Sequence, residues 1–316
     1  MKPRFFILIP VFVTLAMLFA SCEKEKDPPS ITGIDAEVNE YTVNFSAVVT
    51  DASSYLWDFG DGNTSTQAAP VHTYEMSGTY TVRLTVTGEG GEVTSTVSVE
   101  ILPSLVEMLT GGPDAANGKT WMLGRGYTEG VNGGGIIDNN MWVMLPTVAN
   151  VLELIGLGDE YDNEFTFHHD GTYEIDAKDG TALTAGIYGM TSTTITNQGN
   201  EFNDLGLVSA LYTPPASATW TLHDEDLVVN AITNPLSDDV PPAISERTIT
   251  GKRWVSLSED AYFGILDFPA TRKFIVKEIT PEKMEVALFV CAYWADWQNS
   301  GDVPTFLFHL SMVPKP

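Results

Sequence analysis

The sequence is poor in cysteine and in basic residues, and each shortage excludes a class of protein. Only Cys22 and Cys291 occur in 316 residues, too few for a disulfide framework or a cysteine-rich zinc cluster. Lysine and arginine number 16 against 42 acidic residues, so the formal net charge is -26. Such a surface repels nucleic acid, anionic lipid headgroups and polyanionic substrates. It suits a neutral ligand or bound calcium. Because Cys291 lies in the apolar run 286–292, we expect it to be a buried free thiol.

The first 22 residues have the pattern of a secretory signal. Lys2 and Arg4 precede an apolar run over residues 5–20, which is too short and wrongly flanked for a membrane span. Residues 18–22, Leu-Phe-Ala-Ser-Cys, resemble a bacterial lipobox, although Phe19 departs from the usual aliphatic residue. This resemblance predicts a mature chain that begins at a lipidated Cys22 and is joined by a charged tether over 23–29. Plain secretion with an unrelated cysteine is the alternative.

Residues 30–102 have the alternation of a small β-sandwich. Residues 55–59 read as a strand that ends at the turn Gly60-Asp61-Gly62, and apolar and polar residues alternate over 79–86. The motif Trp57-Asp58-Phe59-Gly60-Asp61-Gly62 and the segments after it resemble the PKD domain, an immunoglobulin-like β-sandwich. The resemblance implies a spacer or an interaction module.

A second domain is expected over residues 119–316, after a linker over 103–118. Within the linker, the capping-box spacing of Ser104 and Glu107 predicts a short helix to Leu109. Apolar spacing predicts another helix over 148–155, and hairpins are expected over 165–175 and 218–229. Further strands are predicted at 119–123, 246–249, 253–257, 262–266, 273–279, 284–293 and 305–313. The chain is therefore predicted to be all-β, with the PKD-like sandwich followed by a larger β-sandwich or jelly-roll domain resembling a carbohydrate-binding one.

The order of these segments carries a further resemblance. The lipobox, the PKD-like module, the entry strand Gly118-Lys119-Thr120-Trp121 and the late Tyr293-Trp294-x-x-Trp297 segment follow one another. Together they resemble the surface glycan-binding lipoproteins of Bacteroidetes polysaccharide-utilisation systems. The resemblance implies lipid anchoring in the outer membrane, with the protein facing the cell exterior, and capture of a neutral glycan. It also implies a partnership with a transporter of the SusC/SusD type.

Aromatic residues are the candidate binding groups, since flat rings stack on the apolar faces of sugars. The alternation of apolar and polar residues predicts that Trp121 and Trp220 pack in the core of the second domain. Trp57 is expected in the core of the PKD-like module. The pattern around Trp254 does not favour either a buried or an exposed position. The composition around the other tryptophans is typical of loops. The predicted ligand-binding residues are Trp294, Trp297, Trp142 and Tyr127, with Asp296, Gln298 and Asn299 as hydroxyl partners. The alternative is a loop folded over the core.

The acidic segment 159–164 is the candidate for catalysis or metal binding. Glu160, Asp162 and Glu164 have the E-x-D-x-E spacing of retaining β-glucanases of jelly-roll fold, in which two carboxylates act on the glycosidic bond. Tyr161 and Asn163 stand where that pattern requires apolar residues. A solvated strand start, or a calcium site at Asp159, Glu160 and Asp162, are the alternatives. We therefore expect no catalytic residues and no cofactor besides possible Ca²⁺. An extracellular glycoside hydrolase and a structural or adhesion lipoprotein are the other hypotheses.

Overall fold

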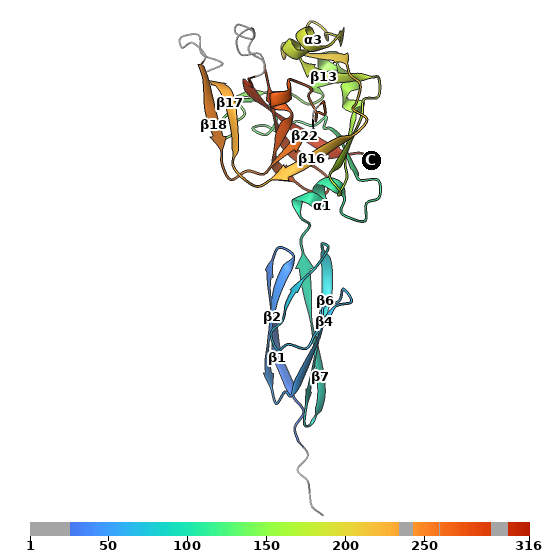
Figure 1. Ribbon diagram of the computed structural model, residues 1–316, viewed down its shortest axis with the longest axis vertical. Helices are drawn as coiled ribbons and strands as arrows, with labels where there is room; N and C mark the ends of the chain where they lie inside the picture. Colours follow the sequence, from blue (N-terminus) through green and yellow to red (C-terminus); the bar gives the residue numbers. More distant parts are fainter. Residues whose placement is uncertain (1–25, 234–242, 259, 292–302) are drawn as a thin grey trace, which may run out of the picture. The chain divides into compact units, whose positions relative to one another are not determined.

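The computed structural model describes residues 26–233, 243–258, 260–291 and 303–316. The chain divides into two compact units, the first ending at Leu102 and the second beginning at Pro103 (Figure 1). The expected linker 103–118 therefore belongs to the second unit. Its helix α1 (Leu105–Thr110) is capped as predicted, because Ser104 Oγ accepts a hydrogen bond from Glu107 N while Glu107 Oε2 accepts one from Ser104 N. Leu105 and Leu109 are buried in the core of the second unit, which explains why the segment folds onto it.

The first unit is the expected sandwich of two antiparallel sheets. One sheet has the order β1 (Ser30–Asn39), β2 (Thr42–Thr50), β5 (Val71–Thr73). The other has the order β4 (Thr64–Ser65), β3 (Ser54–Asp58), β6 (Gly78–Gly88), β7 (Gly91–Ile101). Phe45, Trp57, Phe59, Tyr74 and Leu84 are buried between them. The prediction that Trp57 belongs to this core is confirmed.

The turn motif of the first unit is structural. Asp58 Oδ1 accepts a hydrogen bond from Gly60 N at 3.0 Å, and Asp61 Oδ2 lies 2.7 Å from His72 Nε2. Gly60 has a φ of +81°, and a Cβ there would lie 2.7 Å from the backbone oxygen of Thr81. Only glycine fits this position without strain. The acidic residues of the motif thus hold the turn together.

The second unit is a barrel-like sheet whose strands follow chain order. Its eight-stranded ring consists of β8 (Lys119–Leu123), β11 (Glu164–Phe167), β12 (Thr172–Asp176), β16 (Ala218–His223), β19 (Trp254–Leu257), β20 (Lys273–Ile279), β21 (Met284–Val290) and β22 (Phe306–Pro314). All these pairs are antiparallel, and β22 pairs with β8 to close the ring. A jelly roll would require Greek-key crossovers, so the topology differs from that part of the expectation. The all-β class is confirmed.

Two segments of the second unit differ from the structure that their local sequence pattern predicted. The predicted hairpin 218–229 does not form, because β16 pairs with β12 and β19, whereas β17 (Leu227–Thr233) pairs with β18 (Ala243–Ile249). Leu227 and Val229 instead pack with Phe289 and Leu307 in a second cluster, outside the main core. The predicted strand 262–266 makes only isolated bridges.

Insertions between the ring strands build the rest of the unit. The first contains β9 (Gly133–Ile136), β10 (Leu145–Pro146), α2 (Val151–Leu154) and the 3-10 helix η1 (Gly158–Asp162). The second contains β13 (Thr181–Ala185), α3 (Gly186–Ser192), β14 (Ile195–Asn197) and β15 (Leu207–Leu211), and a 3-10 helix η2 (Pro269–Thr271) precedes β20. The helix predicted over 148–155 is shorter than expected, because Asn150 has a left-handed φ of 54° and only four residues follow in α2.

Aromatic side chains fill the main core of the second unit. They come from facing strands and the segment before η2, and include Trp121, Phe165, Phe167, Tyr173, Trp220, Phe263 and Phe274. Trp121 Nε1 donates to Leu109 O and Trp220 Nε1 donates to His168 O, each at 2.9 Å, so both buried indoles are satisfied. The predictions that Trp121 and Trp220 pack in the core are confirmed, as is the buried free thiol of Cys291.

Asp267 is a buried carboxylate beside this core. Its Oδ1 accepts a hydrogen bond from Phe268 N at 2.8 Å, and its Oδ2 accepts one from Cys291 N at 2.6 Å. Burial raises the pKa of the Asp267 carboxyl to about 7, against these two hydrogen bonds, which favour the ionised form. Asp267 thus ties the segment before η2 to the end of β21, at an electrostatic cost once it ionises.

Replacing Trp220 by alanine should destabilise the second unit. Its buried indole fills the barrel interior, and such truncations typically lower the free energy of unfolding by about 3–5 kcal/mol. Trp142→Ala is the matched control, because 68% of the surface of Trp142 is exposed. Thermal melts of the two variants should show a large decrease in Tm for the first and almost none for the second. Equal melting temperatures would contradict the core assignment.

Asp267 should make stability depend on pH. In the unfolded chain an aspartate has a pKa of about 3.9, so between pH 4 and 7 the folded state binds its proton more tightly. The free energy of unfolding of the wild type, measured relative to Asp267→Asn, should therefore fall as the pH rises through this window. Urea titrations of both proteins from pH 4.5 to 8 test this, and a difference that does not change with pH would refute it.

Candidate functional site

An exposed tryptophan stands on a loop that the fold holds in place. Trp142 lies between β9 and β10, and the loop is anchored by the buried side chains of Ile137 and Met141. Asp138 Oδ1 accepts hydrogen bonds from Asn140 N and Met141 N, each at 2.9 Å. These contacts fix the backbone on one side of Trp142, so its ring is presented from a preformed loop.

The glycine-rich strand β9 allows the chain to return across it. A Cβ on Gly135 would lie 2.3 Å from Trp142 O, and one on Gly133 would lie 2.2 Å from Leu145 O. Met144 N donates to Gly134 O at 2.9 Å. Side chains on β9 would therefore displace the segment that carries Trp142. Glycines in a strand often mark such a close backbone approach.

The surroundings of Trp142 combine exposed apolar side chains with amides. Met144, Leu145 and Val148 are exposed on the chain that follows it. Asn139 and Asn140 precede it and are also exposed, and Asn139 Oδ1 accepts a hydrogen bond from Thr250 N at 2.8 Å. A flat ring next to amide groups can stack on the C–H face of a sugar and bind its hydroxyls. We call this loop, residues 137–148, the Trp142 loop.

The other predicted binding residues do not join Trp142 in the described part of the chain. Tyr127 is half-buried in the loop after β8, and no ring contact between it and Trp142 occurs among the described residues. Five predicted residues lie outside the described residues: Trp294, Asp296, Trp297, Gln298 and Asn299. Cys22 also lies outside them. Trp254 stacks on His223 with ring centroids 3.8 Å apart, and its Nε1 donates to Glu225 O, so its role is structural.

The acidic segment does not form a paired carboxylate site. Glu160 lies in η1 and only 1% of its surface is exposed, so the expected solvated strand start is wrong for this residue. Its carboxylate accepts hydrogen bonds from Asn163 Nδ2 at 2.7 Å and Thr181 Oγ1 at 3.0 Å, while burial raises its pKa. Asp162 lies 3.6 Å from Arg125. Glu164 begins β11 and forms ion pairs with two lysines.

Glu160 therefore links η1 to the β13 insertion. Spacing alone could not show this, because the 3-10 helix turns Glu160 inward and leaves Asp162 exposed. Among the residues that the structure describes, no group of three or more His, Cys, Asp or Glu side chains is placed to hold a metal ion. The calcium candidates Asp159, Glu160 and Asp162 are not brought together as such a group.

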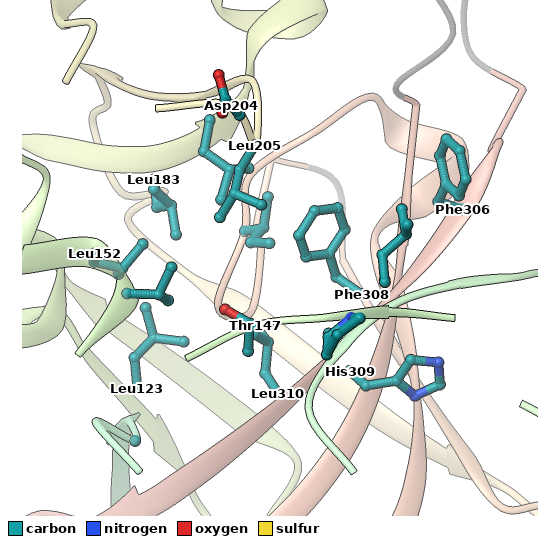
Figure 2. Close-up of a pocket in the computed structure, with 18 of the residues that line it drawn as sticks. Leu123, Thr147, Leu152, Leu183, Asp204, Leu205, Phe306, Phe308, His309 and Leu310 are labelled. Carbon is teal, nitrogen blue, oxygen red and sulfur yellow. The ribbon is translucent and has the colours of Figure 1, made fainter. Parts of the chain in front are cut away.

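The second unit contains an apolar cavity that no pattern in the sequence indicated. It has a volume of about 190 Å³ and is lined by residues of β8, β9, α2, β13, β15 and β22, and by the segments beside them (Figure 2). Leu145 and Pro146, at the end of the Trp142 loop, belong to its wall. The lining comes from segments that are far apart in sequence, so no local pattern could reveal it.

Comparisons with known proteins identify part of the chain. The model of the PKD domain matches residues 26–102. Collagenase ColA of Bacillus cereus is 62% identical over 39 residues, which is 12% of this chain and 4% of that protein. The pre-pro-metalloprotease PrtV of Vibrio cholerae is 59% identical over 39 residues, again 12% of this chain and 4% of that protein. The chain thus covers a small fraction of these curated relatives.

Solved structures were also similar to parts of the chain. The PKD1 domain of Vibrio anguillarum Epp is 30% identical, with a TM-score of 0.24 over 25% of this chain and 100% of that one. A carbohydrate-binding module of the β-sandwich superfamily is 13% identical, covers 92% of each chain and has a TM-score of 0.24, which is too low to relate the two folds.

No helix among the described residues is long and apolar enough to cross a membrane.

The two antiparallel sheets of the first unit enclose the buried Trp57, and the aspartates of its turn motif hold the glycine turn. With the family match over the same residues, these features show that residues 26–102 are a PKD domain.

Proposed function

We propose that this protein is a non-catalytic lipoprotein of the cell surface that binds a neutral oligosaccharide or polysaccharide. The observation that carries the proposal is the exposed ring of Trp142 on a loop that is already held in place. A preformed loop loses little conformational freedom when a ligand binds, so more of the contact energy contributes to affinity. The net charge of -26 favours an uncharged glycan over an acidic one.

The described surface offers both groups that a sugar requires. The indole can stack on the apolar face of a pyranose ring, and the amides of Asn139 and Asn140 can bind hydroxyl groups beside it. Tyr127 remains a proposed ligand contact. So do Trp294 and Trp297, with Asp296, Gln298 and Asn299 as hydroxyl partners.

A glycoside hydrolase is the less favoured function. It would need two carboxylates on either side of a bound sugar. Here Glu160 is buried and bonded to Asn163 and Thr181, while Glu164 pairs with Lys178 and Lys315. These contacts support binding without hydrolysis.

The cellular role proposed for this binding is capture at the outer membrane. A lipid on Cys22 would anchor the chain, and the tether 23–29 and the PKD domain would follow it in sequence. The bound glycan would be passed to a transporter of the SusC/SusD type. The order of the segments supports this role.

Trp142→Ala should weaken glycan binding without unfolding the protein. Aromatic stacking contributes on the order of 1–3 kcal/mol, taking base stacking as the analogue, which corresponds to roughly fivefold to more than a hundredfold in Kd. Phe202→Ala is the matched control, because 61% of the surface of Phe202 is exposed on another loop. Isothermal titration of the wild type, after a screen of neutral polysaccharides, provides the measurement. Unchanged affinity of Trp142→Ala, or release of reducing sugar by the wild type, would refute the proposal.

Cys22→Ala should move the protein from the membrane fraction to the soluble fraction. Without the thiol no lipid can be attached at this position, while the folded units begin after it. Fractionation of cells that express the wild type or the variant, followed by immunoblotting, tests the anchor, with Cys291→Ser as the control. Retention of Cys22→Ala in washed membranes would count against lipidation.

A further inference from the structure

Two apolar cavities adjoin in the second unit. The first, of about 190 Å³, is bounded by β22 on one side and by α2 and β13 on another. The second, of about 180 Å³, lies against α3 and the end of β21. Leu205, Leu207 and Phe308 line both cavities. Figure 2 shows Leu152, Leu183, Leu205 and Phe308 around the first space. The shared residues place the two cavities side by side.

The lining of the first cavity is almost entirely apolar. Of its polar residues, Tyr161 accepts a hydrogen bond from Leu152 N through its hydroxyl, and the His309 ring lies 3.3 Å from Lys277 Nζ. Asp204 is exposed. Two lining residues carry a buried side-chain atom without a hydrogen-bond partner among the described residues, Thr147 Oγ1 and His309 Nε2. His309 Nε2 faces Gly135, which is not part of the lining, since a Cβ built on Gly135 would lie 3.0 Å from it. Thr147 Oγ1 is therefore the group that a ligand in the cavity would contact. A buried hydroxyl without a partner is costly, and a ligand with one polar group would satisfy it.

This lining does not suit a sugar. A sugar carries several hydroxyl groups, and each would need a hydrogen-bond partner once removed from water. Apart from His309 Nε2, which faces Gly135, the lining offers one such unpartnered side-chain atom among the described residues, Thr147 Oγ1. The space therefore selects a molecule with a long apolar part and a single polar end.

The space is accessible and large enough for such a molecule. Leu145 and Leu205 line the first cavity, yet 50% and 38% of their surfaces are exposed, so its wall extends to the protein surface. An apolar cavity of roughly 150 Å³ in another protein takes up benzene. Each of the two cavities is larger than that, and two cavities side by side suit a chain more than a single ring.

We propose that the two cavities bind one neutral, elongated apolar molecule, such as a hydrocarbon chain, whose hydroxyl or carbonyl end bonds Thr147 Oγ1. The mouths of β-barrels are frequent sites for small apolar ligands. Asp204 at the first cavity and the overall charge of -26 disfavour a carboxylate end. This site shares Leu145, Pro146 and Thr147 with the Trp142 loop, but Trp142 itself is not in its lining, and its ligand differs from a glycan, so it goes beyond the proposed function.

The binding test uses N-phenyl-1-naphthylamine, a neutral apolar dye whose fluorescence rises in apolar surroundings. The full-length protein should bind the dye, and 1-dodecanol should displace it at concentrations at least several-fold below those of dodecanoate. Vesicles of phosphatidylcholine form a separate arm, in which the protein is incubated with vesicles and separated from them before the dye is added, because the dye itself partitions into bilayers. Loss of dye binding after this treatment identifies a lipid chain as the source, and displacement by dodecanol alone identifies a free molecule. Failure of both to displace the dye would overturn the proposal.

Two variants place the ligand in the cavities. Leu205→Trp should fill the shared wall and weaken dye binding about tenfold or more, whereas Leu211→Trp, at the end of β15 and outside both linings, should not. Thr147→Val keeps the side-chain shape and should weaken dodecanol about three- to tenfold, as expected for one hydrogen bond, while leaving the dye unaffected. Circular dichroism verifies folding.

Trp142→Ala separates this proposal from the glycan site, because it should leave dye binding unchanged. Wild-type dye affinity in a folded Leu205→Trp protein, or equal effects of Leu205→Trp and Leu211→Trp, would contradict the assignment of the cavities. If Leu205→Trp does not fold, an unchanged dodecanol affinity in Thr147→Val contradicts the polar contact, and with it the proposed ligand.

Discussion

Pairing of the last strand with the first one of the ring determines the architecture of the second unit. β22 pairs with β21 along one edge, and along its other edge with β9 over residues 306–309 and with β8 over residues 312–314. Closure removes the unpaired edges that an open sheet would present to other chains. It also divides the side chains of β22 into two sets. Phe308, Leu310 and Met312 pack with the main core, whereas Leu307 packs with the outer cluster.

Closure also determines where ligand sites can form. The main core is filled by aromatic rings and sealed in part by α1, while β17 and β18 pack over the outer faces of β20, β21 and β22. The region left for ligand sites is the one where β9, β10 and the β13 insertion meet β22. The Trp142 loop and the apolar cavity share this region, because the loop continues into Leu145 and Pro146 of the cavity wall. The two proposed sites therefore lie on one short stretch of chain while differing in chemistry: one combines an aromatic ring with amides, and the other is apolar.

Local patterns in the sequence predicted local structure well. The alternation of Phe165 and Phe167 with polar residues predicted the β11–β12 hairpin, and the capping box predicted α1. Strand β20 occupies the predicted residues 273–279. The PKD domain was found from a continuous motif. Strand partners were not predictable in this way. Residues 223–226 have the composition of a hairpin turn, yet Leu227 pairs with Ile249, because its burial depends on an outer sheet face formed much later in the chain. The burial of Glu160 depends likewise on Thr181 and Asn163. The cavity could not be predicted either, because its lining comes from many segments that are far apart in the sequence.

Amide hydrogen exchange at the barrel closure tests the central claim most directly. Gly124 N donates to Ser311 O at 2.7 Å, and Lys315 N donates to Thr120 O at 2.9 Å, on either side of the β8–β22 pairing. In a closed barrel these amides open only with the surrounding structure, so their exchange should be slowed as strongly as that of the β20–β21 amides. Fast exchange of both amides beside a protected β20–β21 pair would show an open edge between β8 and β22, and would contradict the closed barrel.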